Sequence, residues 1–93
     1  MRAIWNGVVV AESDATLVVE GNHYFPPESL NRDVLVGSHT TSRCPIKGHA
    51  NYVTVQAGEA LNADAGWYYA QPNPGSEQIT NHVAFWRGVV VVP

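Results

Sequence analysis

The residues with the clearest capacity for chemistry lie in one short segment, Cys44-Pro45-Ile46-Lys47-Gly48. Cys44 carries a thiol, and the ammonium group of a nearby Lys47 favours the reactive thiolate form. His49 follows directly and is a candidate base for that thiol. Cys44 is therefore a candidate catalytic nucleophile. The alternative is a small buried side chain that packs under the turn, which is the more common state of a free cysteine.

The same turn predicts a ligand contact at Lys47 and Gly48. An ammonium at the mouth of a pocket can bind a carboxylate or a phosphate. A glycine beside it lets a ligand approach the backbone closely. The alternative for Lys47 is a solvated side chain or an ion pair with Glu12 or Glu20. Both interpretations of Lys47 remain open on the residues alone.

Aromatic side chains supply the expected wall of such a pocket. Small-molecule sites are mostly apolar, with a few polar groups that orient the ligand. Trp67 and Tyr69 share one face of a predicted strand, and Tyr68 lies on the other, because side chains alternate along a strand. The alternative for each ring is ordinary core packing. The predicted wall consists of Tyr24, Tyr52, Trp67 and Tyr69.

Histidines near the turn raise the question of a metal site. His39, Cys44 and His49 are evenly spaced, as an open three-ligand site allows. Their spacing matches no zinc finger or ribbon pattern, and a loop histidine is more often solvated or hydrogen-bonded than a ligand. We therefore predict no metal and no cofactor. Arg43 and Arg87 are further candidates for contact with an anion, although exposed arginine is the ordinary case.

The elements that must position these residues are expected to be β-strands. Valine-rich runs recur between Gly, Asn, Asp and Pro, which is typical of an antiparallel domain rather than of βαβ units. Proline in a first turn and Glu28 near the positive end of the dipole favour one short helix at Pro27–Asp33. The expected strands are residues 3–11, 16–20, 23–25, 33–36, 50–57, 65–69, 82–86 and 89–92.

Turns and connections complete this expectation. Gly21-Asn22 is predicted to turn between two strands because both residues tolerate positive φ. Arg87-Gly88 is predicted to join the last two strands as a hairpin. Residues 37–42 are expected to form a polar loop, and residues 58–64 a connection.

Length and charge limit the classes of protein and partner. A chain of 93 residues is the size of one domain, so residues 1–93 are expected to share one core. Its net charge of -3 comes from scattered residues, which argues against a nucleic-acid partner. Its apolar runs are too short to span a bilayer, which argues against a membrane partner. A single cysteine forms no internal disulfide, so the cytoplasm is the default compartment.

Several motifs follow one another along nearly the whole chain: Trp5-Asn6-Gly7 with Ala11-Glu12-Ser13, Tyr24-Phe25-Pro26, Cys44-Pro45-Ile46-Lys47-Gly48 with Tyr52, Trp67-Tyr68-Tyr69 with Pro72, and His82-Val83-Ala84-Phe85. Together they resemble the small bacterial and fungal domain catalogued as domain of unknown function 427. The resemblance implies a β-tent-like fold, in which two antiparallel sheets are pinned at one edge and splayed at the other, with a pocket between them.

Two known features of the related proteins are not matched by this sequence. Some larger relatives of the tent architecture hold a structural zinc with four cysteines, whereas this chain has only Cys44. The family is also labelled nucleotidyltransferase-like. The sequence has neither a glycine-rich phosphate loop nor a closely spaced acidic pair for that chemistry.

Three functional hypotheses follow. The leading one is a domain that binds a small ligand between the aromatic wall and Lys47, with Lys47 contacting an anionic group. The second is an enzyme that uses Cys44 as its nucleophile. The third is a structural or self-associating β module, because the low charge density and the valine-rich last strand suit pairing into a homodimer. The residues leave open whether the domain catalyses a reaction.

Overall fold

A computed structural model describes residues 1–93 and confirms a mainly-β chain. Three one-turn 3-10 helices interrupt the strands, namely η1 (Pro27–Ser29), η2 (Arg32–Val34) and η3 (Glu77–Ile79). The strands are β1 (Arg2–Trp5), β2 (Val8–Glu12), β3 (Leu17–Val19), β4 (Asn22–Tyr24), β5 (Leu35–Cys44), β6 (Gly48–Ala57), β7 (Ala60–Tyr68), β8 (Val83–Phe85) and β9 (Val90–Val92).

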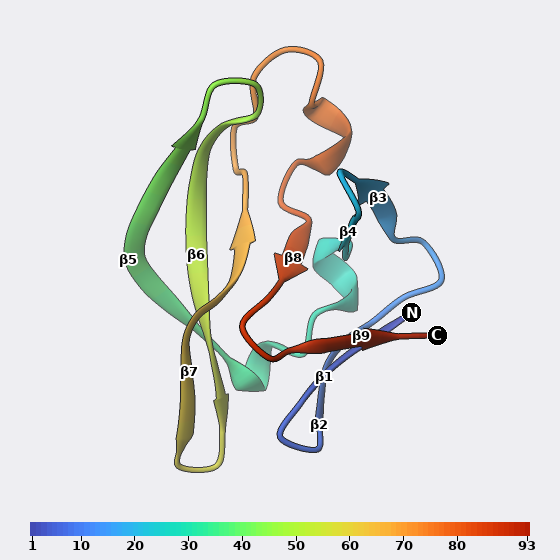
Figure 1. The fold of residues 1–93 in the computed structure, drawn as a ribbon, viewed down its shortest axis with the longest axis vertical. Helices are drawn as coiled ribbons and strands as arrows, with labels where there is room; N and C mark the ends of the chain where they lie inside the picture. Colours follow the sequence, from blue (N-terminus) through green and yellow to red (C-terminus); the bar gives the residue numbers. More distant parts are fainter.

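The strands form three antiparallel sheets, ordered β2-β1-β9, β3-β4 and β5-β6-β7-β8 (Figure 1). The expected two sheets are therefore too few. One cause lies in the expected strand 3–11, which is split by a turn. Asn6 and Gly7 have φ values of 52° and 75°, and two-residue hairpin turns favour Asn-Gly because both positions need positive φ. The first strands thus pair with each other, and β9 joins them.

The single helix expected at Pro27–Asp33 is replaced by η1 and η2. Leu30 and Asn31 between them are extended, with ψ values of 136° and 95°. Leu30 forms an isolated bridge with Ala11, and the Asn31 N–H donates to the Val10 carbonyl at 2.8 Å. These links to β2 need extended backbone, so a continuous helix cannot form there.

The polar residues expected in loops extend two long strands instead. β5 includes residues 37–42, and β7 includes most of residues 58–64. β5 is an edge strand with mostly exposed side chains, so polar residues face water while their backbone pairs with β6. A shift of register between Gly37 and Thr41 marks an irregularity in that pairing.

The closing hairpin is also absent, although its turn forms. Arg87 and Gly88 have φ values of 54° and 88°, and the Val89 N–H donates to the Trp86 carbonyl at 3.2 Å. The flanking strands diverge, however, because β8 pairs with β7 and β9 pairs with β1. The last strand therefore crosses to the sheet of the N-terminus, and both termini lie close together (Figure 1).

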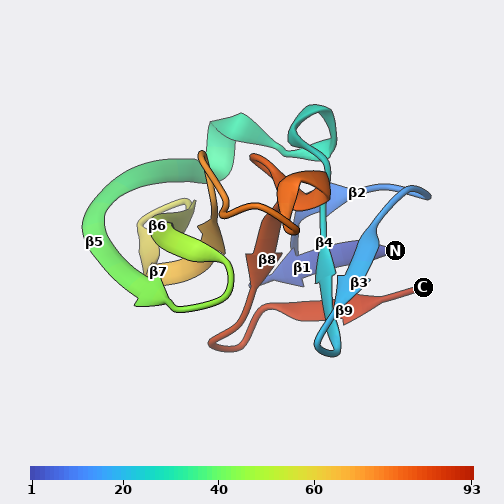
Figure 2. The same ribbon diagram turned by 90° about the horizontal axis from the view of Figure 1, so that it is seen from above.

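The three sheets enclose two groups of buried side chains. Viewed from above, the curved sheet of β5 to β7 lies on one side, and β1, β3, β4 and β9 lie on the other (Figure 2). One group contains Phe25, Val55, Val83 and Phe85 with residues of β1 and β2. The second contains Tyr24, Ala50, Tyr69, Ile79 and Ala84.

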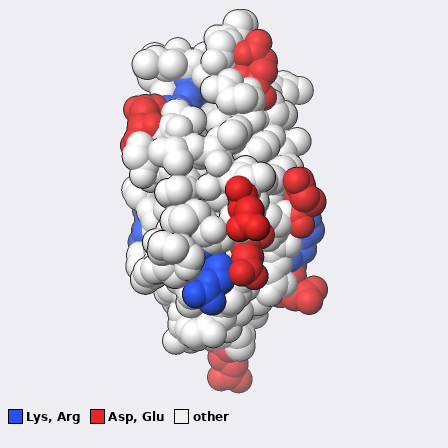
Figure 3. Space-filling model, turned by 90° about the vertical axis from the view of Figure 1, so that its right-hand side faces the viewer, with Lys and Arg blue, Asp and Glu red and all other residues white.

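The surface carries few charges. The face that includes the termini is mostly uncharged, with acidic and basic side chains dispersed over it (Figure 3). The helices of this structure lack the length and the apolar character that a membrane-spanning helix needs.

The packing around Gly66 gives a test of the fold. A Cβ at this position in β7 would lie 2.9 Å from Val53 Cγ2 and 3.1 Å from carbons of Phe85 and Val83. We expect Gly66→Ala to lower the free energy of unfolding by about 1 to 3 kcal/mol, because a packed interior must shift to admit a methyl group. Chemical denaturation measures this. Gly37→Ala, where no atom lies within 4 Å, is the matched control; equal losses in the two variants would contradict the packing.

Candidate functional site

A hollow of about 310 Å³ lies between the β6–β7 face and the β3–β4 hairpin. This volume is at the small end of the range for ligand pockets, about 300 to 1,000 Å³. Five of the six predicted ligand-binding residues line it, and Gly48 does not. The lining residues are Glu20, Asn22, Tyr24, Lys47, Tyr52, Trp67, Tyr69 and Trp86.

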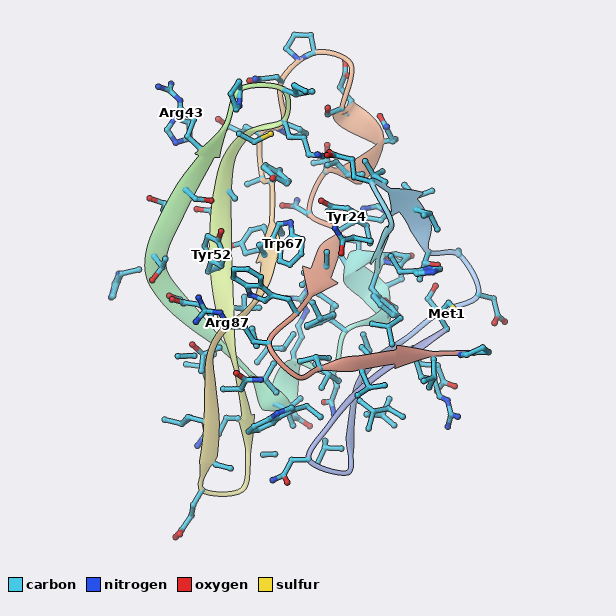
Figure 4. All side chains as sticks on the ribbon, in the orientation of Figure 1. Met1, Tyr24, Arg43, Tyr52, Trp67 and Arg87 are labelled. Atoms are coloured by element: carbon cyan, nitrogen blue, oxygen red, sulfur yellow. The ribbon has the colours of Figure 1, made fainter.

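Strand alternation brings Tyr52 and Trp67 to this hollow. They are directly opposite each other on β6 and β7. The next position in the same row is Ala84 of β8, whose small side chain leaves space beside Trp67. Tyr24 enters from β4, and Figure 4 shows Tyr52, Trp67 and Tyr24 at the same height of the molecule. Residues from three separate strands thus meet at one place.

The rings of Tyr24 and Trp86 stand nearly perpendicular to that of Trp67. The interplanar angles are 89° for Tyr24 and 75° for Trp86, with centroid separations from Trp67 of 6.3 and 5.6 Å. Edge-to-face packing of this kind is a favourable arrangement of aromatic pairs. Trp67 therefore packs edge-to-face with two neighbouring rings of the hollow.

Hydrogen bonds hold two of these rings in place. The Trp67 Nε1–H donates to the Tyr24 hydroxyl at 3.2 Å. The Trp86 Nε1–H donates to the backbone carbonyl of Asp64 at 2.6 Å. The Arg87 guanidinium lies over the Trp86 ring, 4.6 Å from its centroid. Trp86 was not among the predicted wall residues, because nothing in its local sequence indicates which sheet it faces.

Asp64 is itself held by side chains of the neighbouring strands. Ser38 donates to its carboxylate at 2.5 Å and Thr40 at 2.8 Å, and the Asp64 N–H donates to Thr54 Oγ1 at 3.2 Å. These hydrogen bonds, first from Ser38 and then from Thr40, lower the pKa of the Asp64 carboxyl. They fix the backbone carbonyl to which Trp86 donates.

Two tyrosines of the wall are buried and hold their protons more tightly than free tyrosine does. Tyr24 is 2% exposed and Tyr69 is 6% exposed. Burial raises the pKa of Tyr24, against a smaller lowering by the hydrogen bond from Trp67. Burial, with added contributions from Tyr24, Cys44 and Tyr52, raises the pKa of Tyr69 to about 12. Both phenols are therefore neutral near pH 7.

Lys47 is buried and forms an ion pair with Glu20. The Lys47 side chain is 9% exposed, whereas that of Glu20 is 66% exposed. The pair realises one of the two alternatives for Lys47, namely an ion pair with Glu20. A buried ammonium needs a counter-charge, and Glu20 supplies it from the solvent side of the hollow.

A hairpin turn places Glu20 at this position. Glu20 and Gly21 have φ values of 53° and 80° and join β3 to β4. The turn therefore lies one residue before the predicted Gly21-Asn22, and Asn22 belongs to β4 and lines the hollow. Positive φ is unfavourable for glutamate, so tertiary pairing of the hairpin overrides the local preference.

Gly48 has a conformational role rather than a place in the hollow. Its φ is 107°, and an added Cβ would lie 3.1 Å from Asn73 Oδ1. The Asn73 N–H donates to the Lys47 carbonyl at 2.9 Å. The space beside Gly48, which was predicted to admit a ligand, is therefore filled by Asn73.

Cys44 packs beneath the turn. It lies against the buried group that contains Tyr24 and Tyr69, and its Sγ accepts the Lys47 backbone N–H at 3.4 Å. His49 is exposed and opposite Arg43 in the β5–β6 ladder, while Cys44 is opposite Gly48. Since successive residues face opposite sides of a sheet, His49 is not presented to the thiol as a base.

The remaining candidates lie outside the hollow. No three His, Cys, Asp or Glu side chains come together as a metal site, so His39, Cys44 and His49 form no ligand set. Arg43 lies on the outer side of β5, away from Tyr52 and Trp67 (Figure 4).

A second hollow, of about 460 Å³, lies on the opposite face of the β6–β7 pair. It is larger, but it contains none of the predicted site residues and is lined mainly by aliphatic side chains around Val53 and Tyr68. The smaller hollow is the better candidate because aromatic rings and a buried ammonium converge there.

Comparison with known proteins adds a family. The model of the family described as "Domain of unknown function (DUF427)" matches residues 1–92. This match confirms the resemblance found in the motifs. No curated protein matches the sequence. The family description assigns no activity, so function must be argued from the geometry of the hollow.

The Lys47–Glu20 pair predicts a specific order of stabilities. Glu20→Gln leaves a buried ammonium without its counter-charge, and we expect it to lower the free energy of unfolding by about 1 kcal/mol, less than for a fully buried pair because Glu20 is exposed. Lys47→Met removes the charge and keeps an apolar stem, so the double variant should recover stability relative to Glu20→Gln. Urea denaturation gives the order; no recovery in the double variant would contradict it.

The raised pKa of Tyr69 predicts a late step in alkaline titration. Absorbance of tyrosinate should show a component with a midpoint near pH 12 that is missing in Tyr69→Phe. Above the ordinary value of 10.0 the unfolded chain loses this proton first. The contribution of Tyr69 to stability is therefore complete below pH 10 and falls as the pH rises toward 12. A Tyr69→Phe curve identical to that of the unchanged protein would exclude this assignment.

Proposed function

The chain belongs to the family described as "Domain of unknown function (DUF427)", and we propose that it binds a small molecule bearing a carboxylate or a similar acidic group. The observation that carries the proposal is the convergence of a buried ammonium, that of Lys47, with aromatic rings at one hollow. Apolar walls with a few oriented polar groups are typical of small-molecule sites.

The chemistry of the lining suits an acidic group. A carboxylate already occupies the contact with Lys47, namely that of Glu20, so a ligand carboxylate has the same complementarity. The neutral phenols of Tyr24 and Tyr69 retain hydroxyl protons and can donate hydrogen bonds.

The rings of the hollow suit an apolar ligand body. Trp86 is 43% exposed although it is among the largest side chains of the protein. Its ring is held by the Asp64 carbonyl and by Arg87. A large aromatic side chain that is kept at the surface in a fixed orientation offers apolar area to a ligand without further loss of conformational freedom.

The proposal extends to the architecture that the family resemblance implies. Phe25, the residue after β4, forms a bridge with Val83 of β8, and the hollow opens between the hairpin and the β6–β7 face. A join at one edge and a hollow on the other side support a β-tent-like arrangement of these two sheets.

Binding can be tested by thermal denaturation in the presence of a panel of monocarboxylates, including benzoate, phenylacetate, cyclohexanecarboxylate and tert-butylacetic acid. A ligand at one hundred times its Kd stabilises a protein by about 2.7 kcal/mol, which raises the Tm of a domain of this size by about 10 °C or more. We expect Lys47→Met and Trp86→Ala to abolish the shift, because they remove the cation and one wall.

Arg43→Met is the matched control for Lys47→Met, since it removes a cation that lies outside the hollow. It should leave the ligand-induced shift unchanged. Equal shifts in Lys47→Met and Arg43→Met would show that Lys47 does not bind the acid, and the proposal would then be wrong.

A further inference from the structure

The charges of the hollow are balanced before any ligand enters. Lys47 and Glu20 are the only charged residues among its lining, and they are paired with each other. A simple anion must displace Glu20 from Lys47 or lie beside the Glu20 carboxylate. Two negative charges in contact repel each other. A ligand with one charge of each sign satisfies both residues and leaves no unpaired charge.

We propose that the ligand is a zwitterion, with a carboxylate at Lys47 and a methylated ammonium between the aromatic rings near Glu20. The inference rests on the proposed function and names its ligand class. It commits to a small betaine-type molecule, meaning a carboxylic acid that carries a quaternary nitrogen.

The arrangement of rings carries the ammonium half of the inference. Tyr24 and Trp86 are nearly perpendicular to Trp67, so the three rings form adjoining walls rather than a stack. Tyr52 and Tyr69 add to the same lining. Faces of Trp and Tyr attract cations through the ring quadrupole, and boxes of such rings recognise quaternary ammonium groups.

The two indole rings of the hollow favour a methylated over a primary ammonium. A primary ammonium has three N–H donors that need acceptors. The ring N–H groups of Trp67 and Trp86 are donors, and they are already bound to Tyr24 and Asp64. What remains to the ligand from these rings is their apolar faces, which suit methyl groups that carry a delocalised positive charge.

The Trp86 ring already contacts one cation of the protein itself. The Arg87 guanidinium lies 4.6 Å from the centroid of its ring. Arg87 is not among the lining residues, so it covers the ring from outside the hollow. The side of Trp86 that lines the hollow is left for the ligand cation, and Glu20 lies along the same lining to balance its charge.

The experiment compares two ligands of nearly the same shape and different charge. Trimethylammonioacetate and tert-butylacetate differ in one atom, a quaternary nitrogen in the first and a carbon in the second. We expect the zwitterion to bind roughly tenfold tighter by isothermal titration calorimetry, as a cation between aromatic faces allows. Longer homologues of each, matched in the same way, cover other separations between the two charges.

Variants of Trp86 separate an aromatic role from a packing role. Trp86→Leu keeps apolar bulk. It should bring the ratio of the two Kd values, tert-butylacetate over the zwitterion, toward one. Trp86→Tyr keeps a ring and should restore it in part. Glu20→Gln should also lower the preference, since it removes the counter-charge of the ammonium. Circular dichroism of each variant checks that it is folded.

Each outcome decides the inference. Equal, Lys47-dependent binding of tert-butylacetate and the zwitterion overturns it and leaves the proposed function standing. Binding of tetramethylammonium as tightly as of the zwitterion overturns the carboxylate half. Failure of every zwitterion, while other monocarboxylates bind, overturns it as well. Failure of every carboxylate defeats both proposals.

Discussion

The rest of the site depends on one short backbone pairing. Phe25 and Val83 exchange two hydrogen bonds, 2.8 Å from the Phe25 N–H and 2.9 Å from the Val83 N–H. This bridge attaches the small β3–β4 hairpin to the edge of the four-stranded sheet. Because adjacent side chains point to opposite sides of an extended segment, Phe25 enters one buried group and Tyr24 enters the other. One pairing therefore sets both the packing and the ring that meets Trp67.

The aromatic residues serve packing and site geometry at once. A small domain buries a limited fraction of its surface, so its large rings must contribute to the core. Tyr24 and Tyr69 are buried, whereas Trp67 and Tyr52 are only partly covered and line the hollow beside them. These rings therefore take part in the packing of the protein and also line the hollow. The small side chain of Ala84, opposite Trp67 on β8, leaves space for the rings beside it.

Burial of Lys47 makes its ion pair with Glu20 an essential part of the hollow. A lysine at a turn is ordinarily solvated, but the Lys47 side chain is buried at the hollow, and the Asn73 N–H holds the Lys47 carbonyl. Burial makes a counter-charge necessary, and Glu20 provides it from a hairpin turn in which glutamate is locally unfavourable. The hollow therefore carries one charge of each sign and no net charge.

Local sequence determined the parts that depend on alternation and composition. It predicted a mainly-β chain, the strand at residues 50–57 and the shared face of Trp67 and Tyr69, because a period of two is a property of a single strand. Tertiary structure alone decided the rest. The partners of β9, the number of sheets and the role of Trp86 depend on pairings between distant segments, and Arg87-Gly88 forms its turn whichever sheet follows. Glu20 and Lys47 are far apart in sequence, so only the bridge that places the β3–β4 hairpin beside the turn makes them a pair.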